Sequence, residues 1–174
     1  QKLAVGGQLI SIRGLAGEYV EEYLPQYGAH QGHNAALAIA AVESLIGGGR
    51  QQIAADIVSE GLQGATSPGR LQLLGISPTV IVDAAHNPHG AAALAQAMDD
   101  SFDFDEWGVV LGVLADKDAA GIVAKLAPAA AHIFATAPES DRASDADVIA
   151  DLAEAAGHRA TVHPSLADAA DAAR

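Results

Sequence analysis

The sequence predicts an α/β protein whose later part forms a doubly wound, mostly parallel sheet. Two observations support this class. Half of the 174 residues are apolar but only 4% are aromatic, so Val, Ile, Leu and Ala must build most of the core. Strand-like and helix-like segments alternate from Val80 onward. This order is typical of a parallel sheet with right-handed crossovers.

The first part of the chain has a different pattern. Segments 8–13 and 18–24 alternate between apolar and polar residues and predict a hairpin. A helix is expected over 33–46, where small and aliphatic residues continue up to three glycines. A second, amphipathic helix is expected over 51–62, because four of its aliphatic residues share one face: Ile53, Ile57, Val58 and Leu62.

A linker separates the two parts. The stretch "GATSPGR", residues 64–70, consists of small, turn-forming residues that end in one arginine. Such a composition is typical of a loop between structural units. We therefore expect a domain boundary after residue 66, which gives domains over 1–66 and 67–174.

The later part contains four strand-to-helix repeats. Strands are expected at 80–83, 107–114, 132–136 and 160–163, followed by helices at 88–98, 118–127, 144–156 and 165–173. The chain begins at Gln1 without a methionine and stops after a helix, where a sheet of this kind would add another strand. We therefore expect it to be a piece of a longer protein.

Charge and composition exclude several classes of function. The net charge is -13, and a field of that sign repels nucleic-acid backbones and anionic membrane surfaces. No run reaches the roughly 18 apolar residues that a membrane helix needs. There are no cysteines, which excludes disulfides and thiolate metal sites. We expect a cytoplasmic monomer that binds neither nucleic acid nor membranes.

Candidate functional residues gather where the first parallel strand ends, in "TVIVDAAHNPHG". Ligands of open parallel sheets bind beyond the carboxyl ends of the strands, where Asp83 and His86 are expected. Asn87 is a natural helix N-cap and Pro88 a natural first helical residue, so a helix start should point its N–H groups at the same place. The alternative is that Asp83 and Asn87 only cap the turn.

The next strand ends in a similar cluster, "LADKD". Lys117 is a candidate anion ligand because cations are scarce in this chain, whereas Asp118 could be a helix cap alone. Arg70 at the end of the linker could reach a phosphate with both guanidinium nitrogens. The third strand ends in "ATAPESDR", and a solvated loop is the better interpretation of its charges.

A further polar cluster lies at the start of the first helix, in "AHQGHNAAL". The amide of Asn34 both donates and accepts, which suits the edge of an adenine ring. His30 and His33 could suggest a metal, but no third ligand is near in the sequence, so no metal site is expected. The chain also lacks a Gly-rich phosphate loop ending in G-K-S/T.

Together these segments resemble the folylpolyglutamate synthase family, which is related to the Mur ligases and includes bifunctional dihydrofolate synthases. The resemblance rests on four motifs in the order and approximate spacing of that family. They are "GAHQGHNAALAIAAVE", "SPGRLQLL", "VIVDAAHNPHGAAAL" and "GVLADKD". Any one of them alone is a weak signal, but the combination is specific.

The resemblance implies the end of a central ATPase domain followed by most of a Rossmann-like C-terminal ligase domain. It also implies a reaction in which ATP activates a dihydropteroate or folate carboxylate as an acyl phosphate, which L-glutamate then attacks. By resemblance, Asp83 and His86 are catalytic, and Asn34, Arg70 and Asp83 bind ATP. His86 and Lys117 bind glutamate. The phosphate loop and the Mg²⁺ ligands are expected in the missing N-terminal part, so the chain alone should be inactive.

Two alternatives remain at the level of sequence. Another Mur-type amino-acid ligase would share the acyl-phosphate chemistry, but the His-Asn-Pro run favours the folate branch. A non-enzymatic, receiver-like signalling domain is also acidic and doubly wound. That class requires an aspartate at the end of the third strand, which "HIFATAP" lacks.

Overall fold

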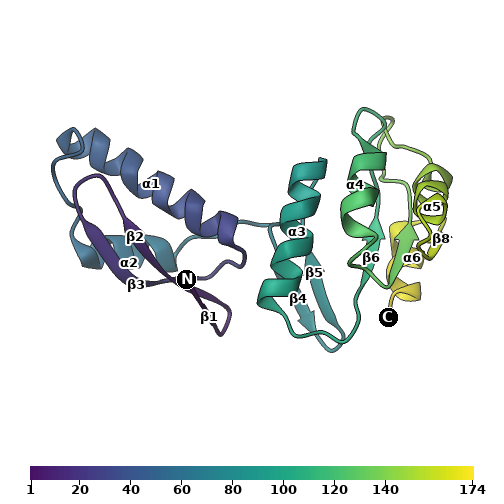
Figure 1. The fold of residues 1–174 in the computed structure, drawn as a ribbon, viewed down its shortest axis with the longest axis horizontal. Helices are drawn as coiled ribbons and strands as arrows, with labels where there is room; N and C mark the ends of the chain where they lie inside the picture. The colour runs from purple at the N-terminus through teal and green to yellow at the C-terminus, as the bar shows by residue number, and fades with distance from the viewer. The chain divides into compact units, whose positions relative to one another are not determined.

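The computed structural model describes all residues from Gln1 to Arg174. Its backbone divides into two compact units, Gln1–Asp83 and Ala84–Arg174 (Figure 1). Each unit has an apolar core of its own. None of its helices combines the length and the apolar character that a membrane crossing requires.

Unit 1 begins with a three-stranded antiparallel sheet in the order β1-β2-β3. Its elements are β1 (Lys2–Ala4), β2 (Gly7–Arg13), β3 (Glu18–Leu24), α1 (Ala29–Gly47) and α2 (Ala55–Gln63). The expected hairpin is confirmed as β2 and β3, and β1 is an additional strand. Alternation along β2 buries Ile10 and Ile12, whereas Ser11 and Arg13 between and after them are exposed.

A buried carboxylate joins the hairpin to α1. Glu43 is fully buried and accepts hydrogen bonds from Tyr19 Oη at 2.7 Å and from the backbone N–H of Ala16 at 3.1 Å and of Leu15. Tyr19 Oη in turn accepts a bond from the N–H of Ile53 at 3.0 Å. Burial, the largest single influence, acts to raise the pKa of Glu43, but these donors together hold the pKa below its ordinary value.

The segment after α2 contains a feature that the sequence analysis missed. Residues 64–71 form neither helix nor strand, as expected for a linker. They lead into β4 (Gln72–Ile76), which pairs antiparallel with β5 (Thr79–Val82) across a turn with a cis Ser77–Pro78 peptide. The expectation that β5 opens the parallel sheet is therefore corrected, because its hydrogen-bonded partner is β4.

This hairpin also affects the division of the chain. The expected boundary after residue 66 would place the hairpin with the later part. In the structure, the compact units divide after Asp83, so the hairpin is counted with unit 1.

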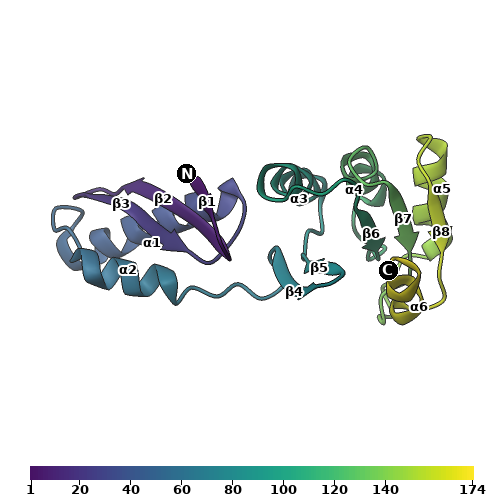
Figure 2. The same cartoon turned by 90° about the horizontal axis from the view of Figure 1, so that it is seen from below.

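Unit 2 contains a three-stranded parallel sheet in the order β6-β7-β8. Its elements are α3 (Pro88–Ser101), β6 (Gly108–Leu111), α4 (Ala119–Leu126), β7 (His132–Ala135), α5 (Ala146–Ala155), β8 (Ala160–Val162) and α6 (Leu166–Ala172). Every expected helix and strand of this part is present. Figure 2 shows α3 and α4 side by side.

Small residues allow the helices of unit 2 to lie close to the sheet. The core combines large aliphatic residues such as Ile122, Leu126 and Ile149 with fully buried alanines such as Ala135 and Ala153. An alanine loses no side-chain entropy on burial and leaves little space between packed elements. This packing fixes the ends of β6 and β7, where the candidate residues lie.

Candidate functional site

The end of β5 and the linker are tied together by Asp83. Its Oδ2 accepts a hydrogen bond of 2.9 Å from the backbone N–H of Leu71. Leu71 is buried and has a φ of 45°, a left-handed conformation that costs a branched residue free energy. Asp83 therefore stabilises an unfavourable backbone conformation directly after Arg70.

Arg70 lies on an exposed turn closed by its own N–H, which donates to Ser67 O at 3.1 Å. None of the ion pairs within the chain involves its guanidinium. Arg70 lines a hollow of about 640 Å³ together with residues of the linker and with Tyr27. A cation placed in this way can bind an anionic group that enters the hollow.

Asn34 lines a second hollow of unit 1, with a volume of about 360 Å³, between α1 and α2. Its Nδ2 donates to the buried Gln31 Oε1 at 3.1 Å, so its own Oδ1 is oriented by that bond. Gln26 and Ala65 line both hollows, and Gln26 Nε2 donates to Ala65 O at 3.4 Å. The structure thus places Asn34 and Arg70 in neighbouring hollows and not in one.

His30, which the sequence analysis set aside, lies near this region. Burial is the main cause that lowers the pKa of His30 below its ordinary value. The charge of Asp83 acts in the opposite direction, and the charges of Arg70 and His33 lower the pKa further. His30 is therefore surrounded by two of the three residues expected to bind nucleotide. Its position at the start of α1, two residues after Gly28, was the only sequence signal for this placement.

In unit 2, the turn before α3 presents His86 at the surface. Asn87 Oδ1 accepts from Gly90 N at 2.8 Å and Pro88 is the first helical residue, which confirms the expected cap. His86 Nδ1 lies 3.0 Å from Ala84 O. A carbonyl oxygen can only accept a hydrogen bond, so Nδ1 donates in this contact and Nε2 is the ring nitrogen left to face a ligand.

A second helix start lies against the first. Asp118 caps α4, with its Oδ1 accepting from Gly121 N at 2.8 Å. A Cβ atom at Gly121 would lie 2.5 Å from Pro88 Cγ, so only glycine lets the two helix starts approach this closely. The positive dipole ends of the two helices are therefore near each other, and both favour anionic groups.

Lys117 is paired within the chain. Its ammonium lies 3.0 Å from Asp116 Oδ2, and Arg142 Nη2 lies 3.9 Å from Asp116 Oδ1. Lys117, with a smaller contribution from Arg142, holds the pKa of Asp116 below its ordinary value. The charged residues of the loop 139–142 are exposed, as expected for a solvated loop, and a bond of 2.7 Å from Ala115 N to Arg142 O ties its end to the segment after β6.

The expected residues thus divide between the units. Asn34, Arg70 and Asp83 belong to unit 1, whereas His86 and Lys117 belong to unit 2. No group of three or more His, Cys, Asp or Glu side chains that could hold a metal ion is present in the chain.

Comparison with known proteins connects these features to one family. Residues 69–174 match the family described as "Mur ligase, glutamate ligase domain". The chain is 48% identical over 160 residues to the dihydrofolate synthase/folylpolyglutamate synthase of Mycobacterium tuberculosis. That match covers 91% of this chain and 32% of the relative, so the chain spans about a third of the relative's length.

Solved structures show the same similarity. A Mycobacterium tuberculosis folylpolyglutamate synthase complexed with ADP matches 99% of this chain and 38% of that one, with a TM-score of 0.94 and 44% identity. E. coli FolC in complex with DHPP and ADP matches 90% of this chain and 35% of that one, with a TM-score of 0.77 and 30% identity. These similarities favour the ligase interpretation over the receiver-like alternative.

Proposed function

Because the chain belongs to the Mur ligase family, whose glutamate ligase domain its residues 69–174 match, we propose that the protein joins L-glutamate to dihydropteroate or a folate at the expense of ATP. The observation that carries this proposal is the pair of abutting helix starts in unit 2. They combine the exposed ring of His86 with the cation of Lys117. Relatives named as dihydrofolate and folylpolyglutamate synthases support the substrate class.

The proposed chemistry has two steps. A carboxylate oxygen of the pterin substrate attacks the γ-phosphorus of ATP, and ADP leaves. The amino group of glutamate then attacks the carbonyl carbon of the acyl phosphate, the tetrahedral adduct collapses, and inorganic phosphate leaves as the amide forms. Negative charge develops on phosphoryl and carbonyl oxygens in both steps, so fixed cations and helix N-termini lower the barrier.

His86 and Lys117 have different tasks in this scheme. The Nε2 lone pair of His86 suits the amino group of glutamate, because it can accept a hydrogen bond and then a proton from the attacking nitrogen. Lys117 suits a glutamate carboxylate, which would compete with Asp116 for the ammonium. The two residues together would orient the nucleophile for attack on the acyl phosphate.

The nucleotide is proposed to lie against unit 1. Asn34 would contact the adenine and Arg70 the phosphates. Asp83 would act mainly by holding the backbone beside Arg70, through its bond to Leu71. A nucleotide fits this part of the chain because an unpaired arginine lines a hollow of about 640 Å³.

Magnesium does not fit the residues of this chain, since no cluster of carboxylates and imidazoles could coordinate it. We propose that its ligands lie in the part of the protein beyond this chain, and we assign it no step here. A Yersinia pestis relative was solved with AMPPNP and Mn ion, which supports a metal-nucleotide complex as substrate. The acidic charge and the lack of cysteine support a cytoplasmic monomer that binds neither nucleic acid nor membranes.

The test is amide formation by the full-length protein that contains this chain. Release of phosphate from ATP should require both L-glutamate and dihydropteroate or a folate, and mass spectrometry should show one added glutamate. D-glutamate and L-aspartate serve as matched controls for the amino acid, and the 174-residue chain alone should form no product. Phosphate release that depends on a peptidoglycan precursor and not on a pterin would contradict the proposal.

A further inference from the structure

Two histidines from neighbouring strands of unit 2 converge on one hydroxyl group. Nε2 of His132 on β7 lies 2.9 Å from Oγ1 of Thr161 on β8. Nε2 of His163, which directly follows β8, lies 2.9 Å from the same oxygen. These side chains lie on the face of the sheet opposite the alanine-rich core, because Ile133 and Ala160 pack into that core and residues alternate between the faces.

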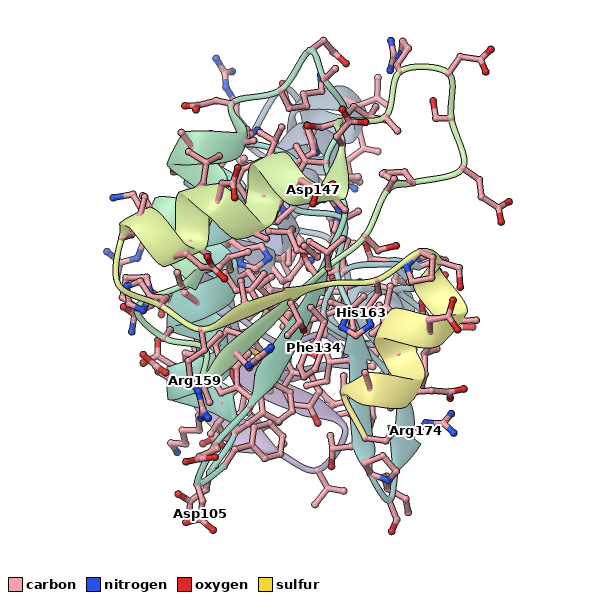
Figure 3. The ribbon with its side chains drawn as sticks, turned by 90° about the vertical axis from the view of Figure 1, so that its right-hand side faces the viewer. Asp105, Phe134, Asp147, Arg159, His163 and Arg174 are labelled. Carbon is pink, nitrogen blue, oxygen red and sulfur yellow. The ribbon has the colours of Figure 1, made fainter.

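An aromatic ring holds the two imidazoles in place. The centroid of Phe134 lies 4.4 Å from that of His132 and 5.7 Å from that of His163. Figure 3 shows Phe134 and His163 beside each other near α6. A Cβ atom at Gly108 on β6 would lie 2.9 Å from Phe134 Cε2, so glycine leaves space for the ring. The cluster is therefore supported from all three strands.

The hydrogen bonds around Thr161 require the two rings to differ. A hydroxyl group has one proton, so Thr161 can donate to one Nε2 only and must accept from the other. One imidazole therefore presents a lone pair toward the common point, and the other presents an N–H group. A shift of that second proton from Nε2 to Nδ1 directs both lone pairs to the same point without any net proton release.

We propose that His132 and His163 form a two-imidazole site for a divalent transition-metal ion of the zinc type. Imidazole nitrogen is a preferred ligand of Zn²⁺, at about 2.0–2.1 Å. The ion would replace the paired hydrogen bonds and join β7 to β8. Water would complete the coordination, since no cluster of three or more acidic or imidazole groups is present.

The experiment is a calorimetric titration of the full-length, nucleotide-free protein with Zn²⁺ at pH 7.5. An excess of Mg²⁺ fills the sites that prefer oxygen ligands. We expect one saturable component that weakens at least tenfold in His132→Asn and equally in His163→Asn. The double variant should bind no more weakly than either single variant, because both rings hold the same ion. His158→Asn makes the same exchange on the loop before β8 and should leave the binding unchanged.

A second measurement requires no variant. Zn²⁺ should raise the melting temperature of the native protein at pH 7.5, and EDTA should reverse that rise. Melting of each variant in EDTA establishes that it folds. The proposal is overturned by the absence of a saturable component, by unchanged affinity in both histidine variants, or by a halved stoichiometry at unchanged affinity, which would indicate two independent rings.

Discussion

The two units of this chain differ in where they place polar and apolar side chains. Unit 1 buries four polar or charged side chains, which are Gln8, Glu22, Gln31 and Glu43, whereas Thr136 is the only one of this class in unit 2. The core of unit 2 is otherwise apolar, and its charged candidates lie at helix starts. We therefore interpret the buried charges of unit 1 as structural and the exposed charges of unit 2 as part of the proposed site.

Large exposed apolar side chains are also more frequent in unit 1 than in unit 2. Helix α1 of unit 1 exposes Leu37 by 70% and Leu45 by 85%. On α2, Ile57 is exposed by 61%, although Val58 and Leu62 of the same predicted face are buried. An exposed apolar surface of this kind usually marks a surface that binds another protein element. Such a surface is compatible with the expectation, from the family resemblance, that residues 1–66 are the end of a central ATPase domain.

The largest expected effect is a loss of stability caused by a cavity in the core of unit 2. Ile149→Ala removes a fully buried side chain from a core with few polar bonds to compensate, and should destabilise the protein by about 2–5 kcal/mol. Denaturant unfolding of the full-length protein would measure this change. Val148→Ala is the matched control, because the adjacent Val148 is 45% exposed and should cost much less. Equal losses for the two variants would show that α5 does not pack as described.

The next effect is kinetic and separates function from stability. His86→Ala should raise the KM for glutamate by a factor of ten to a hundred, since the loss of one charge-assisted hydrogen bond costs about 1.5–3 kcal/mol. The KM for ATP and the melting temperature should change little, because Asn87 and not His86 caps α3. His89→Ala, in the first turn of the same helix, is the control. An unchanged KM for glutamate and an unchanged kcat would remove His86 from the proposed site.

For the hydrogen-bonded network of unit 1, we expect a change in stability and no change in the kinetic constants. Tyr19→Phe removes one of the donors to the buried Glu43 and leaves the N–H of Ile53 without its acceptor, which should destabilise the protein by about 1–3 kcal/mol. Neither KM should change, since Tyr19 lines neither hollow. Tyr23→Phe removes an exposed bond to Val5 O and should cost less. Chemical denaturation and steady-state kinetics on the same samples would measure both quantities.

The dependence of stability on pH should test the same hydrogen-bonded network around Glu43. The pKa of Glu43 is lower in the folded protein than its ordinary value of 4.5, so its contribution to stability is complete above that pH and is lost as the pH falls through the lower, folded value. Tyr19→Phe removes one of the donors that lower this pKa. The loss of stability on acidification should therefore be smaller in the variant and should end at a higher pH than in the native protein, as melting curves between pH 6 and pH 3 would show. If the stability of the native protein and that of Tyr19→Phe fell equally with pH, Glu43 would not be coupled to Tyr19 as described.

Local sequence signals predicted most of the fold, because the elements follow periodic patterns and the helix starts carry specific caps. Asn87 and Asp118 were recognisable as N-caps from their positions, and both make the expected bonds. The strand β4 was missed because its segment, "QLLGI", contains a glycine and has no clear alternation. The partner of β5 depends on that missed strand, so its place in the parallel sheet was wrong.

The contacts of the candidate site were less predictable than its residues. Arg142 lies near Asp116 because its loop, more than twenty residues later in the chain, packs beside the end of β6. No local sequence pattern predicts this contact. The need for glycine at position 121 likewise depends on the Pro88 ring of another helix. Pairwise contacts of this kind are set by tertiary packing, and a single sequence without the fold does not specify them.

The smallest expected effect concerns the cap of α4. Asp118→Ala leaves the N–H of Gly121 without its acceptor and should destabilise the protein by about 0.5–2 kcal/mol. Asp118→Asn should restore most of this loss, because asparagine caps helices as well as aspartate does. If Asp118 only caps, the KM for glutamate follows the native value in both variants, whereas Lys117→Ala raises it. A higher KM in Asp118→Asn with unchanged stability would instead place the carboxylate in the glutamate site, so that unit 2 would use one side chain for both structure and binding.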